Sequence, residues 1–190
     1  MNPNGIIFGK DAQVNVGNLY ASTRYVDPAA AEMARAAGDI HSVLATTSAG
    51  VAADVVNLGK ISATKVEVEG ANIRFVSDNV SATGANVTLK ADGANGGYIH
   101  VGNVNYTGTS TDAPGYTAGS ATSGTVPAIE TYKTIRKANW GDIQNGLSAN
   151  YMLTEDIDAS SGFAPVTGMF TGKFDGLFHT IKNMHVTAGG

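Results

Sequence analysis

The sequence predicts an all-β fold, a parallel β-solenoid, from two observations: short alternating segments and a regular spacing between them. Apolar and polar residues alternate over a few positions at a time, as they do in half-buried strands. Clear examples are Ile6 with Phe8, Ile73 with Phe75, and Ile99 with Val101. Glycine and asparagine separate these segments, and both residue types tolerate the positive φ angles of tight corners.

The second observation is the distance between equivalent segments. Ile61 and Val80 are 19 residues apart, and Val66 and Val87 are 21 residues apart. Hairpins would pair neighbouring segments, whereas a repeat of about 20 residues is typical of a solenoid whose strands each stack on their equivalent one coil later. We therefore expect Ile61 to stack on Val80 and Val66 to stack on Val87.

One segment interrupts the alternation with a helical pattern. Residues 26–39 are rich in alanine, which propagates a helix well. Asp27 is a suitable N-cap, Pro28 suits the first helical position, and Gly38 suits the C-terminal stop. We expect a short helix that decorates the solenoid or covers one of its ends.

A second segment, residues 105–127, has no apolar periodicity and is rich in Gly, Ser and Thr. This composition predicts a long loop or linker. It separates a first β-helical part, residues 1–104, from residues 128–190, which we expect to form further coils.

The second part begins with an irregular pattern. Ile135, Trp140 and Ile143 have a spacing that would let them face inward from a short irregular helix. Residues 150–158 then favour a strand, and residues 170–186 favour a strand, a glycine turn and further strands.

Composition excludes several classes of function. The net charge is −4, with seven Lys and Arg against nine Asp and Glu in residues 1–95 and five against seven in residues 96–190. Neither half is basic, so we expect no nucleic-acid partner. There are no cysteines, which excludes disulfides and thiolate chemistry. His179 and His185 have no carboxylate at a ligand-like spacing, and we expect neither a metal site nor a cofactor.

The opening residues carry a more specific signal. The string begins with Asn2, Pro3, Asn4 and Gly5, then continues with apolar residues 6–8, Gly-Lys-Asp-Ala at 9–12, Leu19, and Ala-Ser-Thr at 21–23. This ordered string resembles the NPNG region of the two-partner secretion domain, which is found in filamentous haemagglutinins and high-molecular-weight adhesins of Gram-negative bacteria. The similarity continues less specifically through residues 55–79.

The resemblance implies a right-handed parallel β-helix and a role in export. In the family, an outer-membrane partner transporter recognises the domain, and the rest of the exoprotein, usually an adhesin, follows it out. The family has cap strands and an earlier Asn-Pro-Asn motif before NPNG. Residues 1–104 are therefore similar to the second half of such a domain, followed by passenger. The expected location is secreted or on the outer cell surface, with a host receptor or glycan as a further partner.

The NPNG motif also has an architectural interpretation. Pro3 fixes its φ angle, and Asn4 with Gly5 supplies a positive-φ corner. The side chain of Asn2 can hydrogen-bond to the turn backbone. The favoured role is a turn that sets the register of a coil, and direct contact with the transporter is the alternative.

A cluster of carboxylates supports an alternative hypothesis, in which the protein is an enzyme that degrades polysaccharides. Asp156 and Asp158 would point to the same side of one strand, and Asp175 would lie one coil away. Enzymes that cleave glycosidic bonds use such paired carboxylates. We expect no catalysis, because "DID" is common where a strand meets a turn and its carboxylates then bond to the backbone.

Four phenylalanines lie 4 to 7 positions apart near the C-terminus, at Phe163, Phe170, Phe174 and Phe178. They could form a sugar-binding platform. Burial in the solenoid core or under its last coil is the favoured interpretation, since phenylalanine is usually buried.

A third possibility is a structural stalk that binds no ligand. For any of these functions, an open solenoid end exposes unpaired strand edges and apolar core. We therefore expect self-association through the solenoid ends unless the helix or the last coil covers them.

Overall fold

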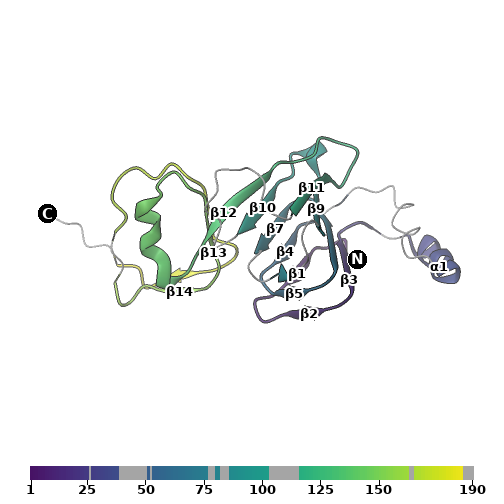
Figure 1. Cartoon of the computed structure of the whole chain (residues 1–190), viewed down its shortest axis with the longest axis horizontal. Coiled ribbons are helices and arrows are strands. Elements are labelled where there is room, and N and C mark those ends of the chain that lie inside the picture. The colour runs from purple at the N-terminus through teal and green to yellow at the C-terminus, as the bar shows by residue number, and fades with distance from the viewer. Residues whose placement is uncertain are drawn as a thin grey trace.

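Strands predominate in the computed structural model of the chain, which describes residues 1–25, 27–38, 51, 53–76, 80–81, 86–102, 116–162 and 165–185. Within these residues the chain forms one α-helix, α1 (Pro28–Ala37), and two 3-10 segments, Gly93–Asn95 and Lys137–Asn145. Every strand pair within the same residues is parallel. The prediction of an all-β fold with parallel strands is confirmed (Figure 1).

The strands form one long sheet, two shorter sheets and one two-stranded sheet. The long sheet has the order β1 (Ile6–Phe8), β4 (Val55–Asn57), β7 (Ile73–Val76), β10 (Ile99–Gly102), β12 (Ile129–Ile135), β13 (Tyr151–Leu153) and β15 (Phe174–Asp175). A four-stranded sheet consists of β3 (Asn18–Ser22), β6 (Lys65–Gly70), β9 (Val87–Ala91) and β11 (Tyr116–Ser120). The remaining strands are β2 (Gln13–Asn15), β5 (Lys60–Ser62) and β8 (Val80–Ser81) in one sheet, and β14 (Ile157–Asp158) with β16 (Ile181–Lys182) in another.

The chain visits the first three sheets in rotation. It passes through β1, β2 and β3, then β4, β5 and β6, then β7, β8 and β9. Each strand therefore pairs with the strand of the same sheet in the next set. The two predicted stacks are confirmed, because Ile61 pairs with Val80 and Val66 pairs with Val87.

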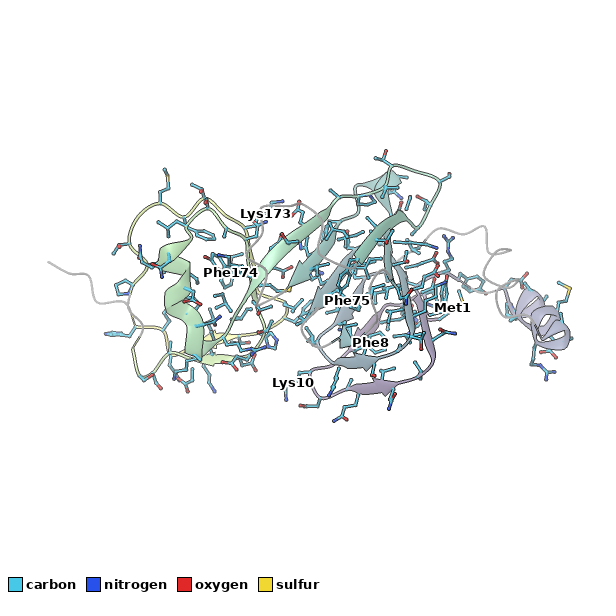
Figure 2. All side chains as sticks on the ribbon, in the orientation of Figure 1. Met1, Phe8, Lys10, Phe75, Lys173 and Phe174 are labelled. Carbon is cyan, nitrogen blue, oxygen red and sulfur yellow. The ribbon has the colours of Figure 1, made fainter. Side chains whose placement is uncertain are left out.

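The first core lies between these three sheets. Val55, Ile73, Ile99 and Ile129 stack in register along the long sheet, and each is at most 2% exposed. Burial of a branched aliphatic side chain stabilises a fold by about 2 kcal/mol. Phe75 is fully buried in the same core, and Figure 2 shows it among the strands.

A second apolar cluster lies on the outer side of the long sheet. Side chains alternate across a strand, so Val56 and Val76 point away from the first core. Both are nevertheless buried, together with Tyr132 and Met152, because Leu177 packs against them. Residues 175–179, which we call the covering segment, thus lie over the outer face of the long sheet.

The segment expected as a loop contains a strand. Residues 116–120 form β11, which pairs along its whole length with β9. Tyr116 and Ala118 are the apolar residues of β11 that pack against the core, and the remaining positions are Thr, Gly and Ser. Two apolar inward residues suffice for a strand that has a partner, although they give almost no periodicity. Residues 105–115 of the same expected loop lie outside the described residues.

The C-terminal part contains a third core. Ile143 of the 3-10 segment packs with Tyr151 and Leu153, and Trp140 packs against the same cluster. The inward position of Trp140 and Ile143 is confirmed, whereas Ile135 belongs to β12 and not to the irregular helix. The strand expected over 150–158 is divided into β13 and β14.

The predicted helix is present with the expected ends. The Asp27 carboxylate accepts a hydrogen bond from the Ala29 amide at 3.0 Å, and Gly38 has a φ of +68°. Figure 1 shows α1 apart from the sheets, so it does not cover β1, β2 or β3. No helix in the described part of the chain has the length and apolar character needed to cross a membrane.

Candidate functional site

The NPNG turn immediately precedes β1. The Gly5 amide donates to the Asn2 carbonyl at 3.2 Å, and the Asn4 amide donates to the Asn2 side chain at 3.1 Å. Gly5 has a φ of +109°, a conformation that favours glycine. The Ile6 amide then donates to the Asp54 carbonyl at 3.1 Å, which starts the pairing of β1 with β4. The predicted side-chain hydrogen bond of Asn2 and the predicted positive-φ corner are therefore present, and the positive φ lies at Gly5.

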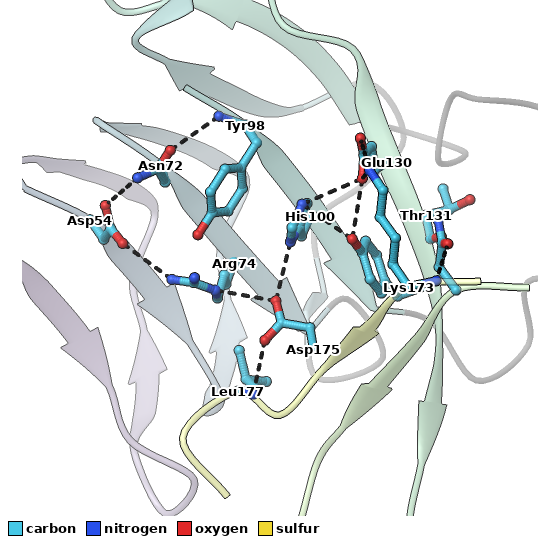
Figure 3. Close-up of polar contacts among 12 residues, drawn as sticks. Asp54, Asn72, Arg74, Tyr98, His100, Glu130, Thr131, Lys173, Asp175 and Leu177 are labelled. Carbon is cyan, nitrogen blue, oxygen red and sulfur yellow. Dashed lines mark hydrogen bonds and ion pairs between the residues drawn. The ribbon is translucent and has the colours of Figure 1, made fainter. Parts of the chain in front are cut away.

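A row of polar side chains crosses the outer face of the long sheet beside this turn. Arg74 in β7, His100 in β10 and Glu130 in β12 occupy the same register position. Neighbouring strands lie about 4.8 Å apart, so adjacent members of such a row can contact one another or share a partner. Figure 3 shows this row and its partners.

Arg74 lies between two carboxylates. Its Nη1 donates to Asp54 Oδ2 at 3.1 Å, and its Nε donates to Asp175 Oδ2 at 3.2 Å. The guanidinium also lies 5.1 Å from the ring centre of Tyr98 and 5.7 Å from that of Phe178. Such distances allow a cation–π attraction. Arg74, in β7, therefore joins Asp54, which directly precedes β4, to the covering segment.

His100 occupies the centre of the row. Its Nδ1 is 3.1 Å from Asp175 Oδ2, and its Nε2 is 3.2 Å from the Tyr132 hydroxyl. An ionised carboxylate only accepts, so His100 Nδ1 donates to Asp175, while the Tyr132 hydroxyl also donates to Glu130 Oε2 at 3.2 Å. The His100 ring also stacks on Tyr98, with 4.1 Å between ring centres.

The carboxylates of the row are kept ionised. Burial alone would raise the pKa of Asp175, but hydrogen bonds from His100 and Leu177 and the charge of Arg74 reverse this, so the pKa lies below its ordinary value. For Glu130, burial is likewise outweighed by Lys173, whose Nζ is 2.7 Å from Oε1, and the pKa is lowered.

Tyr132 contacts the row through its hydroxyl, while its ring lies in the second apolar cluster. The residue is 1% exposed, and burial, with a contribution from Glu130, raises the pKa of its hydroxyl well above the ordinary value. Asp175, His100 and Tyr132 form a chain of hydrogen bonds that joins the covering segment to β10 and β12.

The opposite side of the body carries a second polar group, on the four-stranded sheet. Glu69 is 5% exposed and accepts hydrogen bonds from Tyr20, Ser22 and Arg24. Arg24 also donates to the Ala121 carbonyl, so it spans the sheet from β3 to the end of β11. A buried carboxylate with several donors is a structural arrangement.

The three aspartates of the predicted cluster do not share a site. Asp156 Oδ1 accepts from the Thr180 amide at 2.9 Å, and Asp158 Oδ1 accepts from the Ser160 amide at 2.9 Å. Asp175 belongs to the polar row instead. Because Ile157 pairs with Ile181, the position that stacks on Asp156 is Thr180, five residues beyond Asp175.

Hydrogen bonds to Asp156 and Asp158 also fix their ionisation. The Thr180 amide, followed by His179, lowers the pKa of Asp156. The Asn183 side chain and the Ser160 amide lower the pKa of Asp158 to about 2. Carboxyl groups with lowered pKa values are poor general acids near neutral pH. Both residues hold the turns around β14 and β16.

The phenylalanines are more exposed than expected. Phe170 is 37%, Phe174 is 42% and Phe178 is 72% exposed. Burial in the core is therefore wrong for these three residues, and Phe163 lies outside the described residues. Phe174 makes an edge contact with Trp140 at 6.3 Å between ring centres, whereas Phe178 stands at the edge of the polar row.

A pocket of about 200 Å³ joins the NPNG turn to the polar row. We call it the turn pocket. Its lining combines the turn, two outward-facing apolar side chains, one carboxylate and the exposed aromatic ring, namely Asn4, Gly5, Ile6, Ile7, Asp54, Val56 and Phe178. The described residues contain no group of three or more Asp, Glu or His side chains placed to hold a metal ion.

The sequence indicated the NPNG turn but not the polar row. Arg74 and His100 are 26 positions apart, and His100 and Glu130 are 30 positions apart. Neither interval matches the period of about 20 residues, because the segments between these strands differ in length. Comparisons of this chain with protein-family models, with curated proteins and with solved structures found no match.

Proposed function

We propose that this chain is part of a secreted or cell-surface exoprotein of the two-partner secretion type, an adhesin, in which it forms a right-handed parallel β-helix without catalytic activity. The observation that carries the proposal is the position of the NPNG turn. It lies directly before β1, a strand in a stack of parallel strands, just as the motif of the similar family is followed by an apolar strand.

The strand order supports the β-helical part of the proposal. A chain that visits three sheets in rotation and pairs each strand with its equivalent in the next set winds as a coil. A right-handed path is favoured for parallel strands joined by crossovers. An experimental electron-density map tests this point, and a left-handed coil would contradict it.

The side chains of the turn support a role in recognition by an outer-membrane transporter. Asn2 is used within the turn, but the Asn4 side-chain amide has no hydrogen-bond partner among the described residues and is exposed. An exposed amide on a rigid turn is available to a partner. Edge strand β1 beside it also offers backbone groups on its outer side.

Export of the full exoprotein tests the transporter proposal. In Gram-negative cells that carry the partner transporter, Asn4→Ala should reduce release into the medium at least tenfold while leaving the thermal midpoint of the purified chain unchanged. Asn15→Ala, an exposed asparagine of β2 in the same coil, serves as the control and should be released normally. Normal release of the Asn4 variant would refute recognition through this side chain.

The environments of the carboxylates support a non-catalytic function. Asp156 and Asp158 bond to turn backbones, and Asp175 is committed to Arg74 and His100. A polysaccharide-degrading site needs carboxylates that face one sugar ring across an open groove. Detection of new reducing ends after incubation with polysaccharides, lost in Asp156→Asn, would revive the enzyme hypothesis.

A further inference from the structure

We propose that the turn pocket binds one neutral pyranose ring, presented at the end or along the side of a glycan. The inference rests on the proposed function, because it names the class of ligand that a cell-surface exoprotein would take at this place. It requires neither the transporter nor any catalytic group.

The size of the turn pocket selects a single ring. Its volume of about 200 Å³ is below the range of roughly 300–1,000 Å³ that is typical for drug-sized ligands. The pocket lies between an exposed edge strand and the covering segment, so a longer glycan could continue into solvent from either side of the bound ring.

Phe178 provides an apolar face for the sugar. The residue is 72% exposed and has a φ of +65°, a conformation that is unfavourable for a residue with a side chain. Burial of the ring does not account for this conformation. The neighbouring residues hold it in place, because Leu177 is buried and the His179 amide donates to the Gly176 carbonyl at 2.8 Å. A fixed, exposed aromatic face suits the polarised C–H groups of a pyranose.

Asp54 and Asn4 provide the polar contacts. The Asp54 carboxylate accepts from Asn72 at 2.8 Å and from Arg74 at 3.1 Å, which uses two of about four lone-pair sites. Its side chain is 37% exposed and lines the pocket, so it can accept from a sugar hydroxyl. The exposed side-chain amide of Asn4, which also lines the pocket, can donate to a second hydroxyl. A sugar hydroxyl can both donate and accept hydrogen bonds, so a sugar can donate to the Asp54 carboxylate and accept from the Asn4 amide.

The local charge favours a neutral sugar. Asp54 is paired with Arg74, so the pocket has little net charge for a charged ligand to neutralise. A uronic or sialic acid would bring its carboxylate close to Asp54 and be repelled. An amino sugar would be repelled by the Arg74 guanidinium. A hydroxyl-rich neutral ring avoids both costs.

The test uses the purified full chain and the methyl glycosides of glucose, galactose and mannose. Saturation-transfer NMR should show contact with at least one of them, and titration should give a Kd of about 1 mM, as expected for a single small ring. Phe178→Ala and Asp54→Asn should each weaken binding about tenfold. Tyr25→Ala, an exposed aromatic outside the pocket, and Asp11→Asn, an exposed carboxylate, should leave binding unchanged.

Three results would overturn the proposal. The first is no binding of any of the three glycosides at about 100 mM, and the second is unchanged binding by Phe178→Ala. The third is tighter binding of methyl glucuronide than of methyl glucoside. Because Phe178 is exposed, its alanine variant should keep the thermal midpoint and the export of the parent protein, so failure of sugar binding is distinguishable from failure of the proposed export.

Discussion

Gly5 is the residue on which the NPNG turn depends. With φ at +109°, an added side chain is strained, and its Cβ would lie 3.4 Å from the Asp54 carbonyl oxygen. We expect Gly5→Ala to lower the free energy of unfolding by about 1–2 kcal/mol, measured by denaturant titration. The control is Gly9→Ala in the next turn, where no atom lies within 4 Å of the added Cβ. Equal stability of the two variants would contradict this account of the turn.

Asp175 should give the fold a specific dependence on pH. Its pKa is lowered in the folded chain, so its contribution is present above the unfolded value of about 3.9 and is lost as the pH falls through the lower, folded value. At pH 7, Asp175→Asn should cost about 2 kcal/mol of unfolding free energy, because hydrogen bonds to a charged group are lost.

Denaturant titrations from pH 7 to pH 2 check the prediction for Asp175. The difference between the parent and Asp175→Asn should shrink below about pH 4, because the parent then also loses the ionised carboxylate. Asp142→Asn, an exposed carboxylate of the 3-10 segment, should show no such change. A difference that is constant over the whole range would contradict the role assigned to Asp175.

Single residues could be predicted from the sequence where they stack at the regular interval. Ile61 and Val80 pair as expected, because their separation of 19 residues is close to the regular interval. The pairing of Arg74 with His100 could not be predicted, because the loop between their strands shifts the interval. The prediction that Phe178 is buried was wrong for another reason. Apolarity indicates burial on average, but it does not indicate which phenylalanine a turn will leave on the surface.

At the scale of the element, the covering segment depends on Leu177. This side chain is 2% exposed and closes the second apolar cluster. Leu177→Ala should lower the unfolding free energy by about 2–3 kcal/mol and raise amide hydrogen exchange in residues 175–179. Met169→Ala, at a side chain that is 79% exposed, is the matched control and should change neither quantity. Unchanged exchange in the Leu177 variant would show that other contacts hold the segment.

Strands were predicted correctly where apolar residues occupy every second position and so lie on one face. β1, β7 and β10 alternate clearly, and each was expected. β11 was not, because a strand that gains its stability from a neighbour needs little hydrophobic signal of its own. The covering segment could not be predicted either, since its contacts join residues about 100 positions apart.

At the scale of the whole molecule, the first three strands of the chain leave three sheet edges unpaired. β1, β2 and β3 each lie at the edge of their sheets, and α1 does not cover them. We propose that the chain self-associates through this end. The sedimentation coefficient should then rise with concentration, and Ile7→Lys, which places a charge on β1, should suppress the rise. Met33→Lys on α1 is the control. A strictly monomeric parent would contradict the proposal.

The bond between Arg74 and Asp175 joins residues 101 positions apart, and this separation has a kinetic consequence. Pairs between strands in successive sets can form as soon as about 40 residues are available. The contacts of the polar row to Asp175 form only after β15, the last strand of the long sheet, is in place. These contacts should therefore be absent from the folding transition state. Weakening them should accelerate unfolding and leave the folding rate nearly unchanged, so the covering segment determines how long the folded chain persists.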